Sequence, residues 1–157
     1  MTDASEKYWS GVVTHVHRLE LHKEITQQAH LPLTFVGQAI SSSQQRLSTP
    51  EKEAYAIYQV FRKLDYFFLG ENPVHVYTDH RNLMFAFNPH AFEPTLGRHV
   101  ITKVQRWALS LSQFDYTIEH ILGKLNIFAD MLKRWTKSYQ TRQTSMGSVH
   151  SLVMRAK

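Results

Sequence analysis

The stretch STPEKEAYAIYQVFRKLDYFFLGENPVHVYTDH, residues 48–80, contains a predicted helix followed closely by a predicted strand. Ser48 and Glu51 have the spacing of a capping box, a common way to start a helix. Apolar residues then recur at helical spacing up to Gly70, a residue type that often ends helices. The pattern predicts one helix over residues 49–69. Its apolar stripe consists of Ile57, Val60, Leu64 and Phe68.

Two carboxylates have informative positions in this stretch. Glu53 lies in the first turns of the helix, on its apolar side, where a carboxylate is costly unless a cation or a hydrogen-bond donor meets it. Asp79 ends the predicted strand PVHVYTD, residues 73–79, and ligands gather at the carboxyl ends of strands in α/β sheets. Each also has a plain structural interpretation, in which Glu53 interacts with the helix dipole and Asp79 caps the next helix.

The residues before this stretch predict a β-rich start. Residues 8–17 (YWSGVVTHVH) and 32–40 (PLTFVGQAI) are rich in aromatic and β-branched residues and predict two strands. The polar segment 18–30 between them predicts a long hairpin excursion. Asp3 opens the first strand region, in a position that also suits a turn or a frayed end.

The residues after the stretch predict a short helix or turn at 81–87, an amphipathic helix at 98–112, a strand at 114–121 and a final helix at 125–135. Asp130 lies on the apolar side of the final helix, and its plain alternative is an ion pair with Arg134 one turn later. The whole order predicts an α/β fold in which helices flank a mixed sheet. The residues expected to face inward from the amphipathic helix are Val100, Val104, Trp107, Ala108 and Leu111.

Composition limits the class of protein. A chain of 157 residues suits one globular domain, predicted over residues 1–135, with a polar and flexible tail at 136–157. The lack of cysteine excludes disulfides and cysteine-based zinc sites, and we expect an intracellular location. No apolar run approaches the roughly 18 residues of a membrane span, so no membrane partner is expected. The net charge of +5 favours a polyanionic partner.

A set of short motifs occurs in one order along the chain, and as a set they resemble the ribonuclease H domain that follows reverse transcriptase in gypsy-type LTR-retrotransposon polyproteins. The resemblance covers about residues 1–135 and implies a ribonuclease H-like fold with a five-stranded mixed sheet flanked by helices. Only Met1 and Thr2 precede Asp3, where that family has several apolar strand residues. We therefore expect a short first strand and Asp3 on a fraying end. The motifs are Asp3-Ala4-Ser5, STPEKEAYAI at 48–57, Tyr77-Thr78-Asp79-His80, Arg106-Trp107 and the run from Phe114 to Arg134.

The resemblance further implies endonucleolytic hydrolysis of the RNA strand of RNA–DNA hybrids during reverse transcription. Asp3, Glu53, Asp79 and Asp130 would bind two Mg²⁺ ions, with Mn²⁺ as a substitute. Asp3 would bridge the ions, Glu53 and Asp79 would hold the ion that activates water, and Asp130 would hold the ion on the leaving-group side. Hard oxygen ligands suit Mg²⁺, and two ions about 4 Å apart suit an in-line displacement at phosphorus.

Other residues are carried over as supporting candidates. His120 is a candidate proton shuttle, His80 a candidate support for Asp79, and Asn82 a candidate contact to the DNA backbone. The expected partners are an RNA–DNA hybrid and the reverse transcriptase domain of the same polyprotein, with the isolated domain monomeric. Candidate phosphate contacts are Arg81, Arg98, Lys103, Arg106 and Lys124, for each of which a solvated surface role is the alternative.

Two rival interpretations stay open. His15 and His17 would project to one face of a strand, but the chain has neither cysteine nor an HExxH pattern, which disfavours a dedicated zinc protein. The stronger rival is a catalytically weak or inactive fragment that keeps the fold as a structural or nucleic-acid-binding module. The presence of all four acids favours the enzyme.

Overall fold

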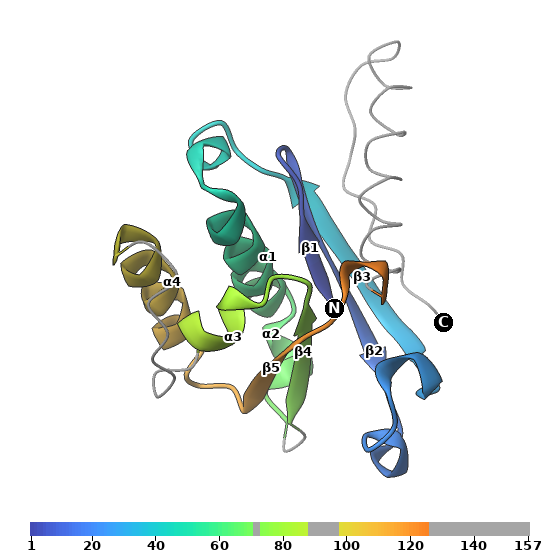
Figure 1. Ribbon diagram of the computed structural model, residues 1–157. Helices are drawn as coiled ribbons and strands as arrows, with labels where there is room; N and C mark the ends of the chain where they lie inside the picture. The colour runs from blue at the N-terminus through green and yellow to red at the C-terminus, as the bar shows by residue number, and fades with distance from the viewer. Residues whose placement is uncertain (71–72, 88–97, 126–157) are drawn as a thin grey trace.

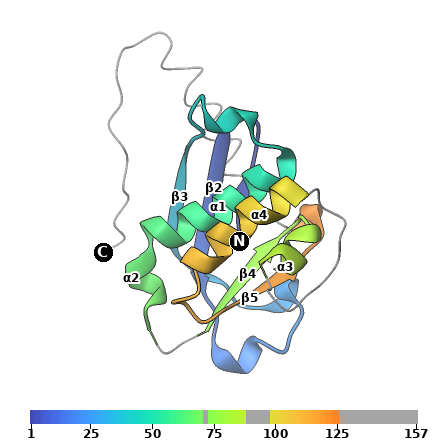
Figure 2. The same ribbon diagram turned by 90° about the vertical axis from the view of Figure 1, so that its left-hand side faces the viewer.

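The computed structural model describes residues 1–70, 73–87 and 98–125, and places helices on one side of the strands (Figures 1 and 2). The α/β fold predicted from the sequence is confirmed. Helices α1 and α4 pack against each other and lie over the strands. The strands are β1 (Thr2–Ala4), β2 (Tyr8–His15), β3 (Leu31–Ala39), β4 (Val74–Thr78) and β5 (Tyr116–His120). The α-helices are α1 (Thr49–Lys63), α2 (Asp65–Phe68), α3 (Asn82–Ala86) and α4 (Arg98–Ser110).

The five strands form two hydrogen-bonded groups. Strands β1, β2 and β3 make an antiparallel meander, and β4 and β5 make a parallel pair. The resemblance led us to expect one five-stranded sheet, and β1 does lie beside β4. The ladder between them is missing from the described residues because β1 is only three residues long and Ala4, on its outer edge, donates its N–H to Glu53.

The predicted excursion at residues 18–30 links β2 to β3. It contains two short 3₁₀ helices, Arg18–Glu20 and Ile25–Gln27. The carboxylate of Glu20 closes the loop, since it accepts the N–H of Ala29 at 2.6 Å and pairs with Lys23 at 3.0 Å. Gln28 and His30 add bonds to the carbonyls of Lys23 and Ile25, so the excursion is a connection closed by several side-chain contacts of its own.

Helix α1 begins as predicted but ends early. The N–H of Ser48 donates to Oε2 of Glu51 at 2.7 Å, so the capping box is present. The single helix predicted over residues 49–69 is wrong, because Leu64 leaves the helical region at φ −123° and ψ 26° and separates α1 from α2. The break brings Phe68 within 4.7 Å of Phe61, ring centroid to ring centroid, so aromatic packing compensates for the lost helical turn.

The core lies between the strands and the helices α1 and α4. In α4, Val104 is fully buried, with Leu111 buried just beyond the helix end, and Lys103 and Arg106 face solvent, which matches the predicted faces. Strand β2 approaches α1 closely at Gly11, where an added Cβ would overlap the side chain of Val60. This close approach positions the first turns of α1 above β1.

Three predictions fall outside the described residues: the final helix at 125–135, its Asp130, and the tail at 136–157. The side chains of Arg98 and Lys124 also lie outside the description. In the part of the chain that is described, no helix has the length and apolar character needed to cross a bilayer.

Candidate metal centre

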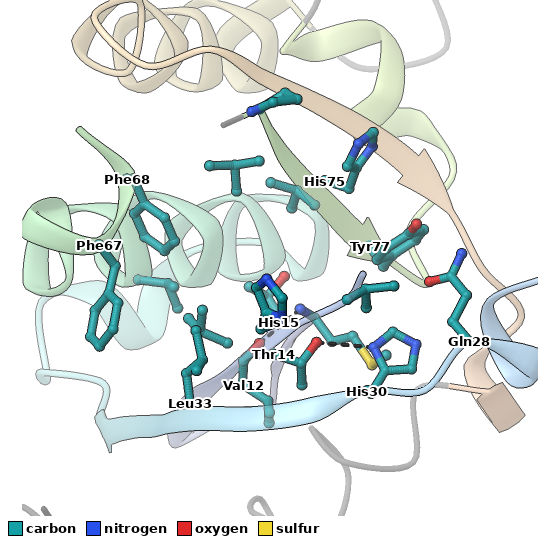
Figure 3. Close-up of a pocket in the computed structure, with 18 of the residues that line it drawn as sticks. Val12, Thr14, His15, Gln28, His30, Leu33, Phe67, Phe68, His75 and Tyr77 are labelled. Carbon is teal, nitrogen blue, oxygen red and sulfur yellow. Dashed lines mark hydrogen bonds between the residues drawn. The ribbon is translucent and has the colours of Figure 1, made fainter. Parts of the chain in front are cut away.

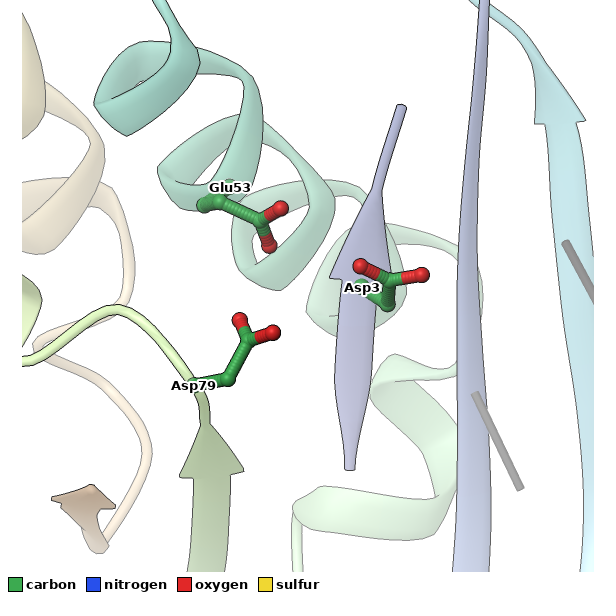
Figure 4. Close-up of side chains that lie close together, drawn as sticks. All are labelled: Asp3, Glu53 and Asp79. Atoms are coloured by element: carbon green, nitrogen blue, oxygen red, sulfur yellow. The ribbon is translucent and has the colours of Figure 1, made fainter. Parts of the chain in front are cut away.

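Three carboxylates from three separate elements meet at one point of the fold. Asp3 comes from β1, Glu53 from α1, and Asp79 from the residue after β4 (Figure 4). One oxygen of each carboxylate lies within 4.8 Å of the others. The structure thus brings together three of the four acids singled out in the sequence, although they are far apart along the chain.

Asp3 is held in place despite its short strand. It is paired with Ser10 across the antiparallel ladder and is only 5% exposed. The α-amino group of Met1 donates to the carbonyl of Val12 at 3.0 Å, and the N–H of Val12 donates back to the carbonyl of Met1 at 2.9 Å. The expected fraying is therefore not seen, because this two-way pairing fixes the strand on its N-terminal side.

Glu53 is oriented by the backbone of β1. Its side chain is 5% exposed, and both carboxylate oxygens lie within reach of the Ala4 N–H, at 3.1 and 3.2 Å. A backbone donor satisfies part of the negative charge that burial would otherwise penalise. The bond also directs Glu53 toward the residue next to Asp3, which brings the two acids close together.

Asp79 is the exposed member of the group, and the chain around it is well anchored. Thr78 is fully buried, and its Oγ1 accepts the N–H of His80 at 3.2 Å. Its carbonyl accepts the N–H of Ile121 from the neighbouring strand segment at 2.9 Å. A Cβ on Gly123 would lie 3.3 Å from Oδ2 of Asp79, so the lack of a side chain at this position leaves space for the carboxylate.

The donor set fits a hard divalent cation. Carboxylate oxygens are the ligands that Mg²⁺ and Mn²⁺ prefer, and Mg²⁺ typically binds one or two carboxylates while keeping several waters. Two of the three acids, Asp3 and Glu53, are almost fully buried, where neighbouring negative charges are costly without a cation. The exposed Asp79 leaves one side of the group open to solvent and to a substrate.

The supporting candidates lie at the same edge of the strands. His120 is the last residue of β5 and is paired with Thr78, the residue before Asp79. Its side chain is exposed, as is that of Arg81, while His80 and Asn82 are half-buried. His80, Arg81 and Asn82 come one to three positions after Asp79 in the chain, and the pairing of β5 with β4 brings His120 to the same edge.

The basic candidates differ in their surroundings. The ammonium of Lys103 pairs with Oε1 of Glu51 at 2.6 Å and so ties α4 to the start of α1. Partial burial raises the pKa of Glu51, but hydrogen bonds from Lys103 and Ser48 outweigh that effect and hold the pKa below its usual range. Arg81 and Arg106 are exposed, and in the described part of the chain they take part in no ion pair.

Gly123 was not recognised from the sequence as a residue of the site. A glycine after a predicted strand ordinarily marks a turn. Its position in the motif E-H-x-x-G-K, close behind His120, was the available signal. The contact with Asp79 appears only when β5 and β4 are placed side by side.

Comparison with known proteins agrees with this geometry. An archaeal structure, ribonuclease H1 from Halobacterium salinarum, superposes with a TM-score of 0.56 at 15% identity and covers 83% of this chain and 86% of that protein, which shows the fold. The enzymatic polyprotein of Carnation etched ring virus is 29% identical over 135 residues, which is 86% of this chain but 18% of the viral protein. The Pol polyprotein from the Drosophila melanogaster transposon gypsy is 26% identical over 129 residues, 81% of this chain and 12% of that protein.

The chain thus spans less than a fifth of the length of these curated relatives. Further relatives are the Pol polyproteins of other Drosophila melanogaster retrotransposons, such as opus and 297, at 27% and 28% identity. Residues 1–114 match the family model described as the RNase H-like domain found in reverse transcriptase. The chain therefore belongs to the RNase H-like domain family of retroelement reverse transcriptases.

Proposed function

We propose that this domain hydrolyses the RNA strand of RNA–DNA hybrids endonucleolytically as part of a retrotransposon polyprotein that also carries a reverse transcriptase. The observation that carries the proposal is the meeting of Asp3, Glu53 and Asp79, with ligand atoms within 4.8 Å, on a fold shared with a ribonuclease H1. Family membership supports the polyprotein context.

Asp3, Glu53 and Asp79 would hold divalent ions, with Asp130 as the fourth proposed ligand. Mg²⁺ is the proposed natural ion and Mn²⁺ its substitute. When bound, a pair of such ions lowers the pKa of the attacking water and stabilises the leaving 3′ oxygen. Within the protein, the Ala4 N–H keeps the carboxylate of Glu53 oriented, and the exposed Asp79 faces the side from which a hybrid can approach.

His120 is the proposed proton carrier. It is exposed at the end of β5, beside the strand that carries Asp79. A neutral imidazole at that position can accept a proton and pass it toward the leaving oxygen. The half-buried His80 is proposed to support the turn at Asp79 through its own backbone bond to Thr78.

Binding of the hybrid is proposed to depend on shape and phosphate contacts. Arg81 and Arg106 are the proposed phosphate contacts with described, exposed side chains, and Asn82 is a proposed contact to the DNA backbone. Arg98 and Lys124 are proposed for the same role from their place in the chain. Lys103 is the weakest of these candidates, because its ammonium is engaged by Glu51.

The test is cleavage of a hybrid labelled on its RNA strand, with Mg²⁺ or Mn²⁺ and with chelator as the blank. We expect cleavage of RNA in the hybrid and none of free RNA or duplex DNA. Asp79→Asn should abolish cleavage, whereas Asp115→Asn should retain it, because Asp115 is an equally exposed aspartate at the opposite end of the parallel pair. Tight hybrid binding without cleavage under all these conditions would instead support the non-catalytic module.

A further inference from the structure

Helices α1 and α4 meet along an outward seam formed by Tyr58, Arg62, Arg106 and Trp107. The ring of Tyr58 stacks on that of Trp107, with centroids 5.8 Å apart and an angle of 18° between the ring planes. The guanidinium of Arg62, one helical turn after Tyr58, lies over the Tyr58 ring at 5.7 Å from its centroid. Both arginines are exposed and both rings are half-buried, so the seam presents its charged groups to solvent.

The seam faces away from the strands and from the metal centre. Val60 and Phe61 of α1 line a cavity of about 420 Å³ beside β2 (Figure 3), and neither Tyr58 nor Arg62 lines it. Glu53 precedes Arg62 by nine residues, which at about 3.6 residues per turn is roughly two and a half turns. The two side chains therefore leave α1 on opposite sides, about 14 Å apart along its axis at about 1.5 Å per residue. A group bound at the seam is thus separate from the three carboxylates.

The seam is positively charged. Both acidic residues of α1 are buried, and α4 contains no acidic residue. The next acid in the chain, Asp65, accepts the N–H of Tyr66 at 2.8 Å. Within the described part of the chain, Arg62 and Arg106 take part in no ion pair. Two guanidinium groups therefore face solvent along one line of contact without a bound carboxylate.

We propose that the seam is a second phosphate-binding surface, in which Arg62 joins Arg106 to hold nucleic-acid backbone outside the metal centre. A guanidinium that lies over an aromatic ring is held in place and keeps its in-plane N–H donors available, in the planar geometry that suits a phosphate. Since Arg62 already lies over Tyr58 in the unbound protein, less conformational freedom is lost on binding. The choice of nucleic acid as the partner rests on the proposed function.

The surroundings of the arginines favour nucleic acid over an acidic protein. Stable protein interfaces have a desolvated centre of apolar and aromatic side chains. At the seam the rings are already used within the domain, because Trp107 packs against both Tyr58 and Tyr55, the latter at 5.7 Å between centroids. What remains for a partner is charge and N–H donors, which are sufficient for sequence-independent phosphate contacts. The net charge of +5 acts in the same direction.

The test measures binding of a fluorescent RNA–DNA hybrid of about 30 base pairs, in chelator, over a series of salt concentrations. Arg62→Gln removes the charge at the seam, and Arg62→Lys keeps the charge without the planar group. Lys63→Gln is the matched control, because Lys63 is the next residue and is also exposed. Its ammonium lies 5.9 Å from the ring centroid of Trp9, on the strand side of α1, so the control removes the same charge from the other side of the helix.

We expect Arg62→Gln to weaken binding at least about threefold at 0.1 M salt and to reduce the slope of log K against log salt by about 0.9, the value for one phosphate contact. Arg62→Lys should restore the slope, and Lys63→Gln should leave both quantities unchanged. One binding step per chain would assign the seam to the hybrid at the metal centre, whereas a second step lost in Arg62→Gln would assign it to a separate nucleic acid.

Two results would overturn the proposal. An unchanged slope in Arg62→Gln would leave the arginine with a role in helix packing or in contact with an acidic protein. An equal loss in Lys63→Gln would reduce the effect to net charge. Because cleavage does not occur in chelator, the two proposals fail separately. An Arg62-dependent slope in a chain that never cleaves with Mg²⁺ would count against the catalytic proposal alone, and normal cleavage with an unchanged slope would count against the seam alone.

Discussion

Replacing Asp79 by asparagine should stabilise the metal-free domain while removing its response to divalent ions. The three carboxylates lie within 4.8 Å of one another, so in their charged forms they repel when no cation is present. At that separation, two unit charges repel by about 0.9 kcal/mol at the dielectric constant of water and by about 3.5 kcal/mol at an effective value of about 20. Asp79 is exposed and has two such neighbours, so the figure for water applies to each of the two pairs. Removing the charge of Asp79 should therefore add at most about 2 kcal/mol to the free energy of unfolding.

The assay is urea unfolding at pH 7.5 in chelator and in increasing MgCl₂. The unaltered domain should gain stability with Mg²⁺ by binding linkage, and Asp79→Asn should gain far less. Raising ionic strength with a monovalent salt should shrink the advantage of the variant in chelator, because exposed charges are screened over about 10 Å at 0.1 M. Asp115→Asn serves as the control and should change neither quantity, because its side chain lies at the far end of the strand pair.

Two results with Asp79→Asn would contradict this reasoning. If Asp79→Asn unfolds at the same or a lower urea concentration than the unaltered domain in chelator, then the acids do not repel as their spacing indicates. If Mg²⁺ also stabilises both chains equally, then Asp79 is not a ligand, and the metal centre as drawn is wrong.

Three further predictions follow from individual contacts. Gly123→Ala should weaken Mg²⁺ binding, measured by calorimetry, with little change in Tm, because its Cβ would lie 3.3 Å from the Asp79 carboxylate; unchanged affinity would show that the carboxylate moves aside freely. The α-amino group of Met1 has its folded pKa lowered from 8.0 to about 5, so it stays neutral in the folded chain and takes up a proton on unfolding between these values. The free energy of unfolding should therefore rise from pH 5 to pH 8, by at most about 1.4 kcal/mol per unit, and an Nα-acetylated chain measured in parallel should lack that contribution. Lys103→Gln should lower the free energy of unfolding by about 0.5–1 kcal/mol through loss of its pair with Glu51, and it should leave the salt dependence of hybrid binding unchanged. Arg81→Gln should reduce that salt dependence with little loss of stability. The reverse pattern would exchange the roles of these two residues.

Helices and strands could be predicted from the sequence where apolar residues recur at a regular local spacing. The helical spacing of Ile57 and Val60, and the alternation around Val76, are set by contacts with one neighbouring layer, so pattern alone identifies α1 and β4. The break at Leu64 was not predictable, because it depends on the packing of Phe68 against Phe61 in three dimensions. Local sequence continues the helical pattern through that point.

In the site, too, some features are set by local sequence and others only by the tertiary fold. Glu53 and Asp79 could be singled out by their local positions, on the inward side of a helix and at a strand end. Their convergence with Asp3 was expected only from the family resemblance, and the folded structure shows it. The use of Lys103 by Glu51 could not be foreseen, because the two residues lie on different helices far apart in the chain. An exposed lysine on a polar face looks the same in sequence whether it meets a carboxylate or a phosphate.

The bond from Ala4 to Glu53 joins residues 49 positions apart, and it links the quality of folding to the chemistry of the domain. A molecule in which β1 has not docked loses one acid entirely and, at the same time, the donor that aims a second. Molecules in which β1 has not docked should therefore not bind divalent ions, whereas fully folded molecules should bind them. The fraction of a preparation that binds Mn²⁺ then counts the correctly folded molecules directly, which provides a quality measure for refolded or newly expressed protein before any substrate is added.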